Sequence, residues 1–419
     1  MTRTEKRLLV GAILLGLAVR IAYIVLTRGH VLAGDEVEYD LEARFMAAGD
    51  WFFSSTPYGN PHQTTWKAPG YGTLLGSIYA LTGSSVDRAL VVQTLLLGPL
   101  TVGLTFLLGR RLFTIRVGLI AAFVVAVYPN TWQFDVRLYS EVLANPLTIL
   151  AFVLLLTARR PALLGAVIGA SLLVRPSSVF LLAGAAVAFW AAGGAREGTR
   201  QLAICVGIAA LIVAPWSIRN ATLPGPWVPI SVQSAALYGT FNEDAANDQE
   251  LPYKWRPLPA RDVELFRPEN RITDGELYQE LNSRATDYIR ANPESIPNAL
   301  LRNSLQRLWE LRPPGQVLDD TAFEGRTRSV TLVGLLLYYP LLLLALLGLR
   351  RLRRDQLLVV VTLVVVASLA YIGDAGTRYR TPFEPLIVVL AVAALPLERI
   401  SARAAARRGR RGPAPPAVP

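Results

Sequence analysis

The sequence has few of the residues on which many soluble enzymes and secreted proteins depend. A single cysteine, Cys205, lies in an apolar run, so no disulfide can form within the chain. The two histidines, His30 and His62, stand alone in polar segments, where a histidine is more often a surface residue than a metal ligand. No G-x-x-x-x-G-K-[ST] loop and no H-E-x-x-H motif occurs, which argues against nucleotide-driven transport and zinc proteolysis.

Charged residues are also scarce, at 17% of the 419 residues, whereas hydrophobic residues make up 52%. The mean hydropathy is +0.37 and apolar runs recur along the chain, as is typical of an integral membrane protein. We therefore predict an all-α polytopic membrane protein with about ten transmembrane helices and extracytoplasmic juxtamembrane helices. The predicted spans are residues 8–26, 89–109, 117–134, 142–158, 161–174, 177–195, 201–216, 331–349, 357–373 and 382–397.

The distribution of positive charge predicts how these runs are oriented. With the N-terminus in the cytoplasm, the cytoplasmic segments hold 20 lysines and arginines, against 8 in the short segments on the other side. This is the positive-inside bias of a protein of the cytoplasmic membrane, so both termini are predicted to be cytoplasmic. The net charge of +11 is then mostly explained by the cytoplasmic loops, and no nucleic-acid partner is expected.

The order of apolar and polar segments divides the chain into four regions. A stretch at residues 69–83 is too short for a span, and favours an interfacial or re-entrant helix. The polar segment in the middle of the chain has two helical patterns, at 273–292 and 296–312, and is predicted to fold as a cap. The four regions are an N-terminal transmembrane module (1–216) with a first extracytoplasmic loop (27–88), an extracytoplasmic cap (217–330), the C-terminal transmembrane helices (331–398) and a basic, proline-rich cytoplasmic tail (399–419).

The first loop begins with an unusual concentration of acidic residues, AGDEVEYDLEARFMAAGDW at 33–51. Asp35 and Glu36 adjoin, and Tyr39 follows four residues after Asp35 on the same helical face. Lys67 stands later in the loop, in a chain with three lysines against 39 arginines, and a lysine is a compact charge that can meet a phosphate. The alternative is a solvated polar helix capped by Asp35.

The segments DEVEY, RFMAAGDW and KAPGY, which run from Asp35 to Tyr71, resemble the first extracytoplasmic loop of the bacterial lipid-linked-sugar glycosyltransferases. This membrane group has the GT-C fold and includes the aminoarabinose transferases of lipid A and relatives of the protein O-mannosyltransferases. Weaker similarities follow at RLYSE (137–141), LVRP (173–176), PWSIRN (215–220) and RYRTP (378–382). The resemblance implies that Asp35 is the catalytic base and that Lys67 contacts the donor phosphate.

Sugar transfer from a polyprenyl phosphate needs charged groups of these kinds at the membrane surface. A carboxylate must take the proton of the acceptor hydroxyl, and cations must stabilise the departing phosphate. Asp35 and Lys67 supply the two halves, and attack from the face opposite the phosphate would invert the sugar.

Several further residues are candidates for contacts with the substrates. Arg378 and Arg380 precede the last predicted span and are expected to bind the donor phosphate. Substrate contacts are expected from Glu36, Tyr39, Arg137, Glu141, Arg175 and Arg219. The alternatives are a helix-surface pair for Arg137 and Glu141 and membrane anchors for Arg175 and Arg219.

No residue is assigned to a metal. Asp35 and Glu36 could hold a divalent cation, although Lys67 and the arginines could replace one electrostatically.

The sequence therefore predicts a membrane glycosyltransferase that moves a sugar from a polyprenyl-phosphate donor to an envelope acceptor, which is a lipid, a glycan or a protein. The partners expected are this donor, membrane lipid and the acceptor. A lipid-linked-sugar flippase or transporter is the main alternative, and a relative that binds a glycan without catalysis is another. Transporters place ionisable groups near the bilayer midplane, whereas here they gather at the predicted outer interface, with Arg20 as the exception.

Overall fold

The computed structural model describes residues 1–55, 59–158, 160–256, 262, 264, 265, 267 and 271–396. The predicted tail at 399–419 lies outside the described residues. Within them the chain is almost entirely helical, and the one sheet found there is a pair of antiparallel two-residue strands, β1 (Phe53–Ser54) and β2 (His62–Gln63).

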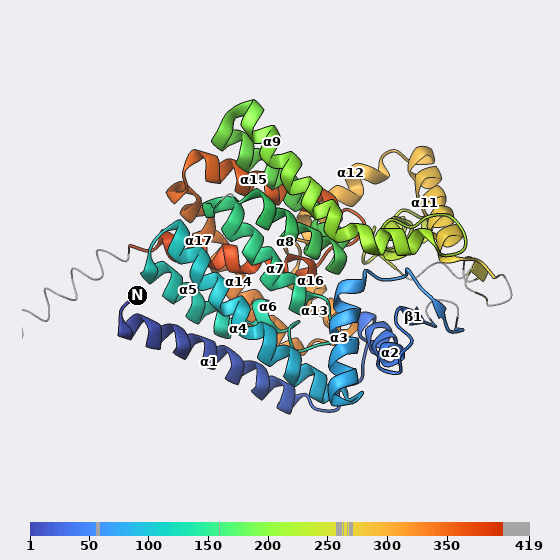
Figure 1. Cartoon of the computed structure of the whole chain (residues 1–419), viewed down its shortest axis with the longest axis horizontal. Helices are drawn as coiled ribbons and strands as arrows, with labels where there is room; N and C mark the ends of the chain where they lie inside the picture. The colour runs from blue at the N-terminus through green and yellow to red at the C-terminus, as the bar shows by residue number, and fades with distance from the viewer. Residues whose placement is uncertain are drawn as a thin grey trace, which may run out of the picture.

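Long apolar helices form the body of the molecule and run side by side (Figure 1). Their largest buried cluster is built from aliphatic and aromatic side chains of α4, α5, α7, α8, α9, α14, α15 and α17. The helices of the body are α1 (Arg3–Leu26), α4 (Val86–Leu112), α5 (Ile115–Val127), α6 (Pro129–Trp132), α7 (Glu141–Val153) with a π-helical end (Leu154–Ala158), α8 (Pro161–Val174), α9 (Phe180–Ala221), α14 (Arg328–Gly348), α15 (Arg354–Ala370) and α17 (Glu384–Ala394).

The protein is a multi-pass membrane protein, but the predicted number of full-length spans is corrected by the structure. In the described part of the chain, four helices are long and apolar enough to cross a membrane: Arg3–Leu26, Val86–Leu112, Pro176–Ala221 and Arg328–Arg351. The other predicted spans are also helical but shorter, including Ile115–Val127, Glu141–Thr157 and Pro161–Val174.

Local backbone features explain the shorter helices. Helix α5 has 13 residues, about 20 Å at 1.5 Å per residue, and stops before Pro129. Helix α9 covers two predicted spans, 177–195 and 201–216, and has a kink close to the boundary between them, at Gly194, whose conformation is non-helical with φ of 68°. The chain turns at this glycine, and the indole nitrogen of Trp190 then donates to Thr199 at 3.2 Å. Hydropathy alone does not register the break at Pro129, which lies inside the span predicted at 117–134.

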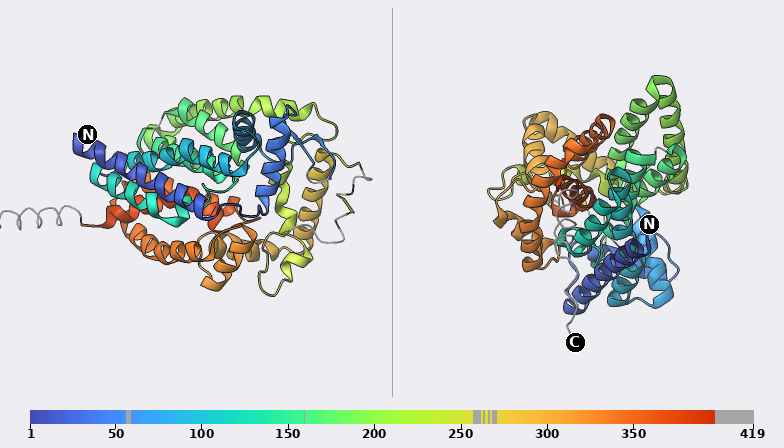
Figure 2. Two further views of the ribbon diagram at one scale, coloured as in Figure 1. Left: turned by 90° about the horizontal axis from the view of Figure 1, so that it is seen from below. Right: turned by 90° about the vertical axis from the view of Figure 1, so that its left-hand side faces the viewer.

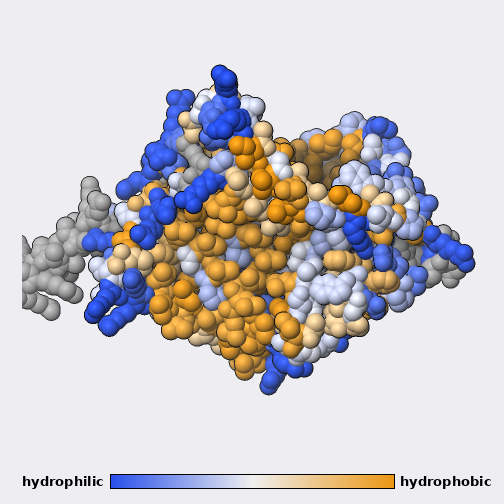
Figure 3. All heavy atoms as spheres, in the orientation of Figure 1, coloured by the Kyte–Doolittle hydropathy of each residue, from blue (hydrophilic) through white to orange (hydrophobic). Residues whose placement is uncertain are grey.

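A hydrophobic band covers the middle of the molecule on the face drawn in Figure 3, with hydrophilic residues toward both ends. The first loop and the predicted cap lie together at the end away from the N-terminus (Figures 1 and 2). The first loop contains α2 (Asp35–Ala47) and α3 (Pro69–Thr82). Helix α3 runs across α1 and α4 rather than alongside them.

The cap has a small hydrophobic core of its own, formed by Val228, Val232, Tyr238, Phe241, Leu277, Leu281, Ala285 and Ala299. Thr273 and Glu276 cap the start of its longest helix reciprocally, as the sequence pattern at 273–292 predicts. Its described elements are η3 (Val232–Gly239), α10 (Glu243–Ala246), α11 (Asp274–Ala291), α12 (Ser295–Ala299), a π-helix (Leu300–Arg307) and α13 (Pro314–Phe323).

Side chains of the first loop and the cap join directly. The carboxylate of Asp274 accepts hydrogen bonds from the backbone N–H of Thr65 at 2.5 Å and from the hydroxyl of Thr64 at 3.0 Å. His62 lies 3.4 Å from the same carboxylate. These contacts fix the strand β2 against the start of α11, so the first loop does not depend on α2 alone for its position.

Candidate active site

Asp35, the predicted base, lies in the first turn of α2 between two cations. The Nζ atom of Lys67 is 2.9 Å from Oδ1 of Asp35, and NH1 of Arg378 is 2.7 Å from Oδ2. Gly34, with φ of 55°, lets the chain turn into α2, and the acidic first turn suits the positive end of the helix dipole. Both oxygens of the candidate base are therefore held by cations from distant segments.

Lys67 is almost completely enclosed by acidic and aromatic side chains. Its residue is 3% exposed, its Nζ lies 2.7 Å from Oε2 of Glu38, and the ring of Tyr39 lies 4.2 Å from Nζ. Glu38 and Tyr39 follow Asp35 by three and four residues, so α2 presents all three side chains toward the same lysine. Burial alone would lower the pKa of Lys67, but Asp35 and Glu38 outweigh it and raise this pKa above its usual range. Lys67 is a permanent cation here.

Arg378 connects Asp35 to the start of α7. Its Nε donates to Oε1 of Glu141 at 2.5 Å, and its guanidinium lies 4.1 Å from the ring centre of Tyr139. Arg175 also donates to Glu141, and its guanidinium lies 4.9 Å from the ring of Tyr379. The predicted residues Asp35, Tyr39, Lys67, Glu141, Arg175 and Arg378 thus form one cluster, which we call the carboxylate–cation cluster.

The cluster holds Asp35 as a carboxylate. Burial acts to raise the pKa of Asp35, but Lys67 and Arg378 outweigh it and hold this pKa well below its usual range. A carboxylate in this state is a weak base. It can take a proton efficiently only after one or both cations move to another anion, and a phosphate is such an anion.

Glu42 lies one turn beyond Glu38 on the same face of α2 and is 4% exposed. Burial raises its pKa to about 7, with Lys67 opposing the increase. Its carboxylate is close to α3, since a Cβ added at Gly72 would lie 3.0 Å from Oε2. The sequence reasoning passed over this residue, although its spacing from Asp35 and Glu38 already places it on their helical face.

Three residues predicted to contact substrate lie outside the carboxylate–cation cluster, namely Glu36, Arg219 and Arg137. The carboxylate of Glu36 accepts from the backbone N–H of Leu138 at 3.1 Å and lies 3.2 Å from His30. Arg219 donates to the backbone oxygen of Thr64 at 2.9 Å. These contacts hold the loop in place. Their predicted role in binding substrate stays a prediction.

Arg137 differs from these, because its Nε and NH1 atoms are buried and have no hydrogen-bond partner among the described residues. Its guanidinium lies 5.8 Å from the ring of Tyr23. A buried guanidinium with unused donors is a candidate contact for an anion.

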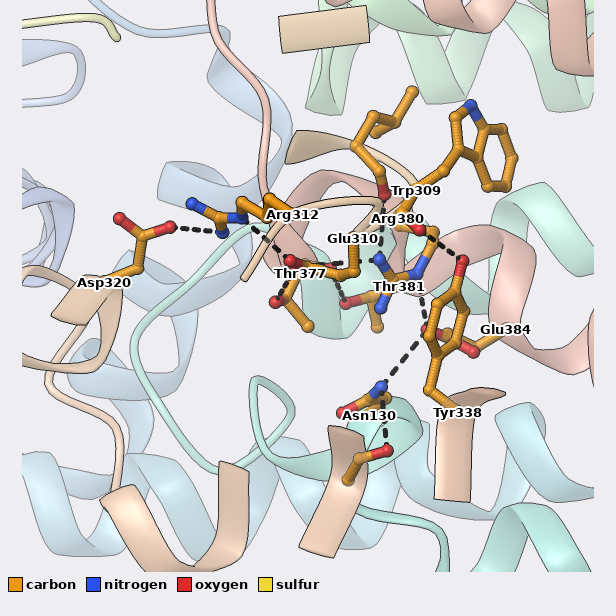
Figure 4. A network of polar contacts seen from close by, with 12 residues as sticks. Asn130, Trp309, Glu310, Arg312, Asp320, Tyr338, Thr377, Arg380, Thr381 and Glu384 are labelled. Carbon is orange, nitrogen blue, oxygen red and sulfur yellow. Dashed lines mark hydrogen bonds and ion pairs between the residues drawn. The ribbon is translucent and has the colours of Figure 1, made fainter. Parts of the chain in front are cut away.

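Arg380 points into a second polar network rather than toward Asp35 (Figure 4). Its Nε donates to Glu384 at 2.8 Å, and its guanidinium lies 3.9 Å from the ring of Tyr338. Glu310, at 3.6 Å, is a further acidic neighbour. Arg380 is 0% exposed, against 8% for Arg378, so Arg380 is less accessible to a phosphate.

Comparison with known proteins supports the resemblance noted in the sequence. Residues 66–218 match the family model of dolichyl-phosphate-mannose-protein mannosyltransferases, a match that contains Lys67 and begins after Asp35. None of the curated proteins matches the sequence significantly.

Solved structures identify the fold. The oligosaccharyltransferase AglB from Archaeoglobus fulgidus, in complex with an inhibitory peptide and a dolichol-phosphate, is 18% identical, with a TM-score of 0.57 over 99% of this chain and 52% of that one. An oligosaccharyltransferase from Archaeoglobus fulgidus in complex with zinc and sulfate is 16% identical, with a TM-score of 0.54 over 95% of this chain and 50% of that one. The chain has the GT-C fold.

This GT-C chain spans about half the length of the oligosaccharyltransferase structures. ArnT from Cupriavidus metallidurans bound to undecaprenyl phosphate is also similar, at 15% identity over 98% of this chain and 82% of that one, with a TM-score of 0.40. That TM-score is too low to add to the fold assignment. The predicted resemblance to the GT-C glycosyltransferases is thus confirmed by the family model and by the fold.

The zinc in one archaeal structure raises the question of a divalent cation in this GT-C chain. Among the described residues, no group of three histidine, cysteine, aspartate or glutamate side chains is arranged to hold a metal. Lys67 and Arg378 occupy the Asp35 oxygens that a cation would use. The donor set therefore does not fit a metal at Asp35.

Proposed function

We propose that the protein is a glycosyltransferase that moves a sugar from a polyprenyl-phosphate donor to an envelope acceptor at the outer face of the cytoplasmic membrane. The observation that carries the proposal is the pairing of one carboxylate, Asp35, with two cations that a departing phosphate could take over. The dolichyl-phosphate-mannose family match and the dolichol-phosphate in the AglB complex support a polyprenyl-phosphate donor.

The chemistry follows from the charges of the cluster. The acceptor hydroxyl oxygen forms a bond to the anomeric carbon while the bond from that carbon to the phosphate oxygen breaks, and its electron pair leaves with the phosphate. The acceptor proton passes to Asp35. Lys67 and Arg378 stabilise the charge that develops on the phosphate. Attack opposite the phosphate inverts the configuration at the anomeric carbon.

Donor binding prepares the base in this scheme. While no donor is bound, Lys67 and Arg378 neutralise Asp35 and make it a weak base. When both cations turn to the phosphate, the pKa of Asp35 rises toward that of a buried carboxylate, because burial is the largest influence on it. The base therefore becomes strong only when a donor is present.

The direct test is transfer of radiolabelled sugar from a panel of polyprenyl-phosphate sugars to total envelope acceptors. We expect transfer by the wild type and none by Asp35→Asn in protein that still binds donor. Glu42→Gln tests the other candidate base on α2, since the pKa of Glu42 is about 7. This variant should retain activity if Asp35 is the base. Asp40→Asn is the matched control, because Asp40 lies on the same helix and pairs with Arg44 and Tyr79 instead.

Four results would contradict the proposal or a part of it. Equal transfer by the wild type and Asp35→Asn would move the base elsewhere, and loss of transfer in Glu42→Gln alone would assign it to Glu42. No transfer with any donor, together with movement of carrier lipid across liposomes, would favour a flippase. Product with retained configuration would contradict the inverting mechanism.

A further inference from the structure

Arg378 lies in a single helical turn, α16 (Thr377–Arg380), which continues through a 3₁₀ turn (Thr381–Phe383) into α17. Thr377 and Arg380 are three residues apart and share one face of this turn, whereas Arg378 points to the other face. The second polar network contacts the face with Thr377 and Arg380 (Figure 4). Arg378, on the opposite face, pairs with Asp35 and Glu141 of the carboxylate–cation cluster.

Glu310 is a residue of the cap whose side chain contacts both Thr377 and Arg380 in this turn. Its Oε1 accepts from the hydroxyl of Thr377 and lies 3.6 Å from NH1 of Arg380. Its Oε2 accepts from Nε of Arg312 at 3.0 Å. The carboxylate therefore meets the turn with one oxygen and an arginine of its own segment with the other (Figure 4).

The backbone at Glu310 is held from a second direction, by α14. Tyr339 donates its hydroxyl proton to the backbone oxygen of Glu310 at 3.0 Å, and Tyr338 donates to that of Trp309 at 3.0 Å. Arg380 donates to the backbone oxygen of Leu308 at 2.8 Å. The position of residues 308–310 is thus set by several independent contacts.

Two features of Glu310 cost folding free energy: the burial of its charge and its backbone conformation. Its side chain is 0% exposed, so the charge is removed from water. Its φ of 51° is in the left-handed region, which residues other than glycine rarely adopt. Strained residues of this kind persist where the surroundings fix them, and they concentrate at functional sites.

We propose that Glu310 is a positioning residue that fixes the α16 turn through Thr377, so that Arg378 on the other face reaches Asp35, Glu141 and the donor phosphate. Glu310 itself contacts none of the carboxylate–cation cluster in the described structure. The inference rests on the proposed function, because Arg378 has a phosphate to bind only if the donor carries one.

The test measures binding of undecaprenyl phosphate, without a sugar, to the purified full-length protein. Thr377→Val removes the hydroxyl without changing the charges of the network, and should weaken binding about tenfold, the factor for one charge-assisted hydrogen bond. Thr377→Ser keeps the hydroxyl and should bind as the wild type does. Glu310→Gln should weaken binding at least as much as Thr377→Val.

Coupling to Arg378 separates positioning from general loosening of the protein. Arg378→Lys should weaken binding, and Thr377→Val combined with Arg378→Lys should bind no more weakly than Arg378→Lys alone, because both changes remove the same contact. Asp262→Asn is the control for a buried cap carboxylate, since Asp262 pairs with Arg284 and Tyr238. It should leave binding unchanged.

Several outcomes would overturn the inference. Wild-type binding by Thr377→Val and Glu310→Gln while Arg378→Lys is weakened would refute positioning and leave the proposed function intact. Effects of Thr377→Val and Arg378→Lys that multiply would also refute it. Unchanged binding in Arg378→Lys would disprove the contact between Arg378 and the phosphate, on which the inference rests. Absence of sugar transfer by the wild type would instead refute the proposed function, while the binding data still decide the role of Glu310.

Discussion

Asp35 and the donor phosphate should compete for the same two cations, so removing the candidate base should strengthen donor binding. In the wild type the phosphate must displace the Asp35 carboxylate from Lys67 at 2.9 Å and from Arg378 at 2.7 Å. Asp35→Asn leaves a neutral amide of nearly the same size. A variant that cannot transfer sugar should therefore bind polyprenyl phosphate more tightly than the active protein.

The magnitude follows from the strength of such pairs. An opposite charge at this distance shifts a carboxylate pKa by about one to three units, and each unit is about tenfold in an equilibrium. The side chain of Asp35 is 21% exposed, so solvent screens part of this interaction, and the lower end applies. We expect binding of undecaprenyl phosphate about tenfold tighter, or about 1.4 kcal/mol.

Titration of undecaprenyl phosphate into purified protein at low and high salt would measure this gain. Glu38→Gln removes one of the two carboxylates that pair with Lys67 and leaves both cations on Asp35, so it should give a smaller gain. Asp40→Asn removes a charge from the same helix without touching either cation, and should give none. Added salt should reduce the gain, since the charges are partly exposed. Equal or weaker binding by Asp35→Asn would refute the competition.

Two further predictions concern the contacts that support the site. The pKa of His62 is raised, because Asp274 outweighs the opposing effect of burial, so their contact should stabilise the junction of first loop and cap below pH 6.5 and weaken as the pH rises through the folded pKa. Hydrogen exchange at residues 62–65, corrected for the intrinsic rate, should therefore become faster from pH 6 to 8 in the wild type. It should not do so in His62→Gln, and identical pH profiles of the two proteins would contradict the prediction. Arg20 donates to Asp135 at 2.8 Å inside the helical body, so Arg20→Leu should destabilise the protein by about 3–5 kcal/mol and the double variant with Asp135→Leu should recover most of it. Thermal unfolding in detergent would measure the stability of the single and the double variant. If the double variant were as unstable as Arg20→Leu, the unpaired charge of Asp135 would not be the cause of the instability.

Residues that are neighbours along the chain could be predicted from the sequence. Asp35, Glu36 and Tyr39 were expected on one polar helix, and α2 contains all three because helical spacing depends only on nearby residues. Lys67 was singled out by its rarity and its place in a resembling motif, and it lies 2.9 Å from Asp35. The predicted spans coincide with helices because hydropathy is a local property, but the break at Pro129 shortened the span predicted at 117–134.

Contacts between distant segments could not be predicted in this way. Arg378 and Arg380 looked equivalent in RYRTP, yet the turn that contains them sends one to Asp35 and the other to Glu384. Glu310 carried no motif, because its importance depends on a turn far along the chain and on a backbone conformation that sequence does not reveal. Asp135, the partner of Arg20, was missed for the same reason.

The sequence by itself determined that this is a helical membrane protein that resembles the GT-C glycosyltransferases, with an acidic helix beside a membrane span. Those properties depend on hydropathy, helical spacing and a compact motif. The tertiary structure alone decided which charges meet, as with Arg378 and Glu141, 237 residues apart. The physical reason is that a buried charge needs a partner wherever packing brings one within reach, and packing depends on the whole arrangement of helices.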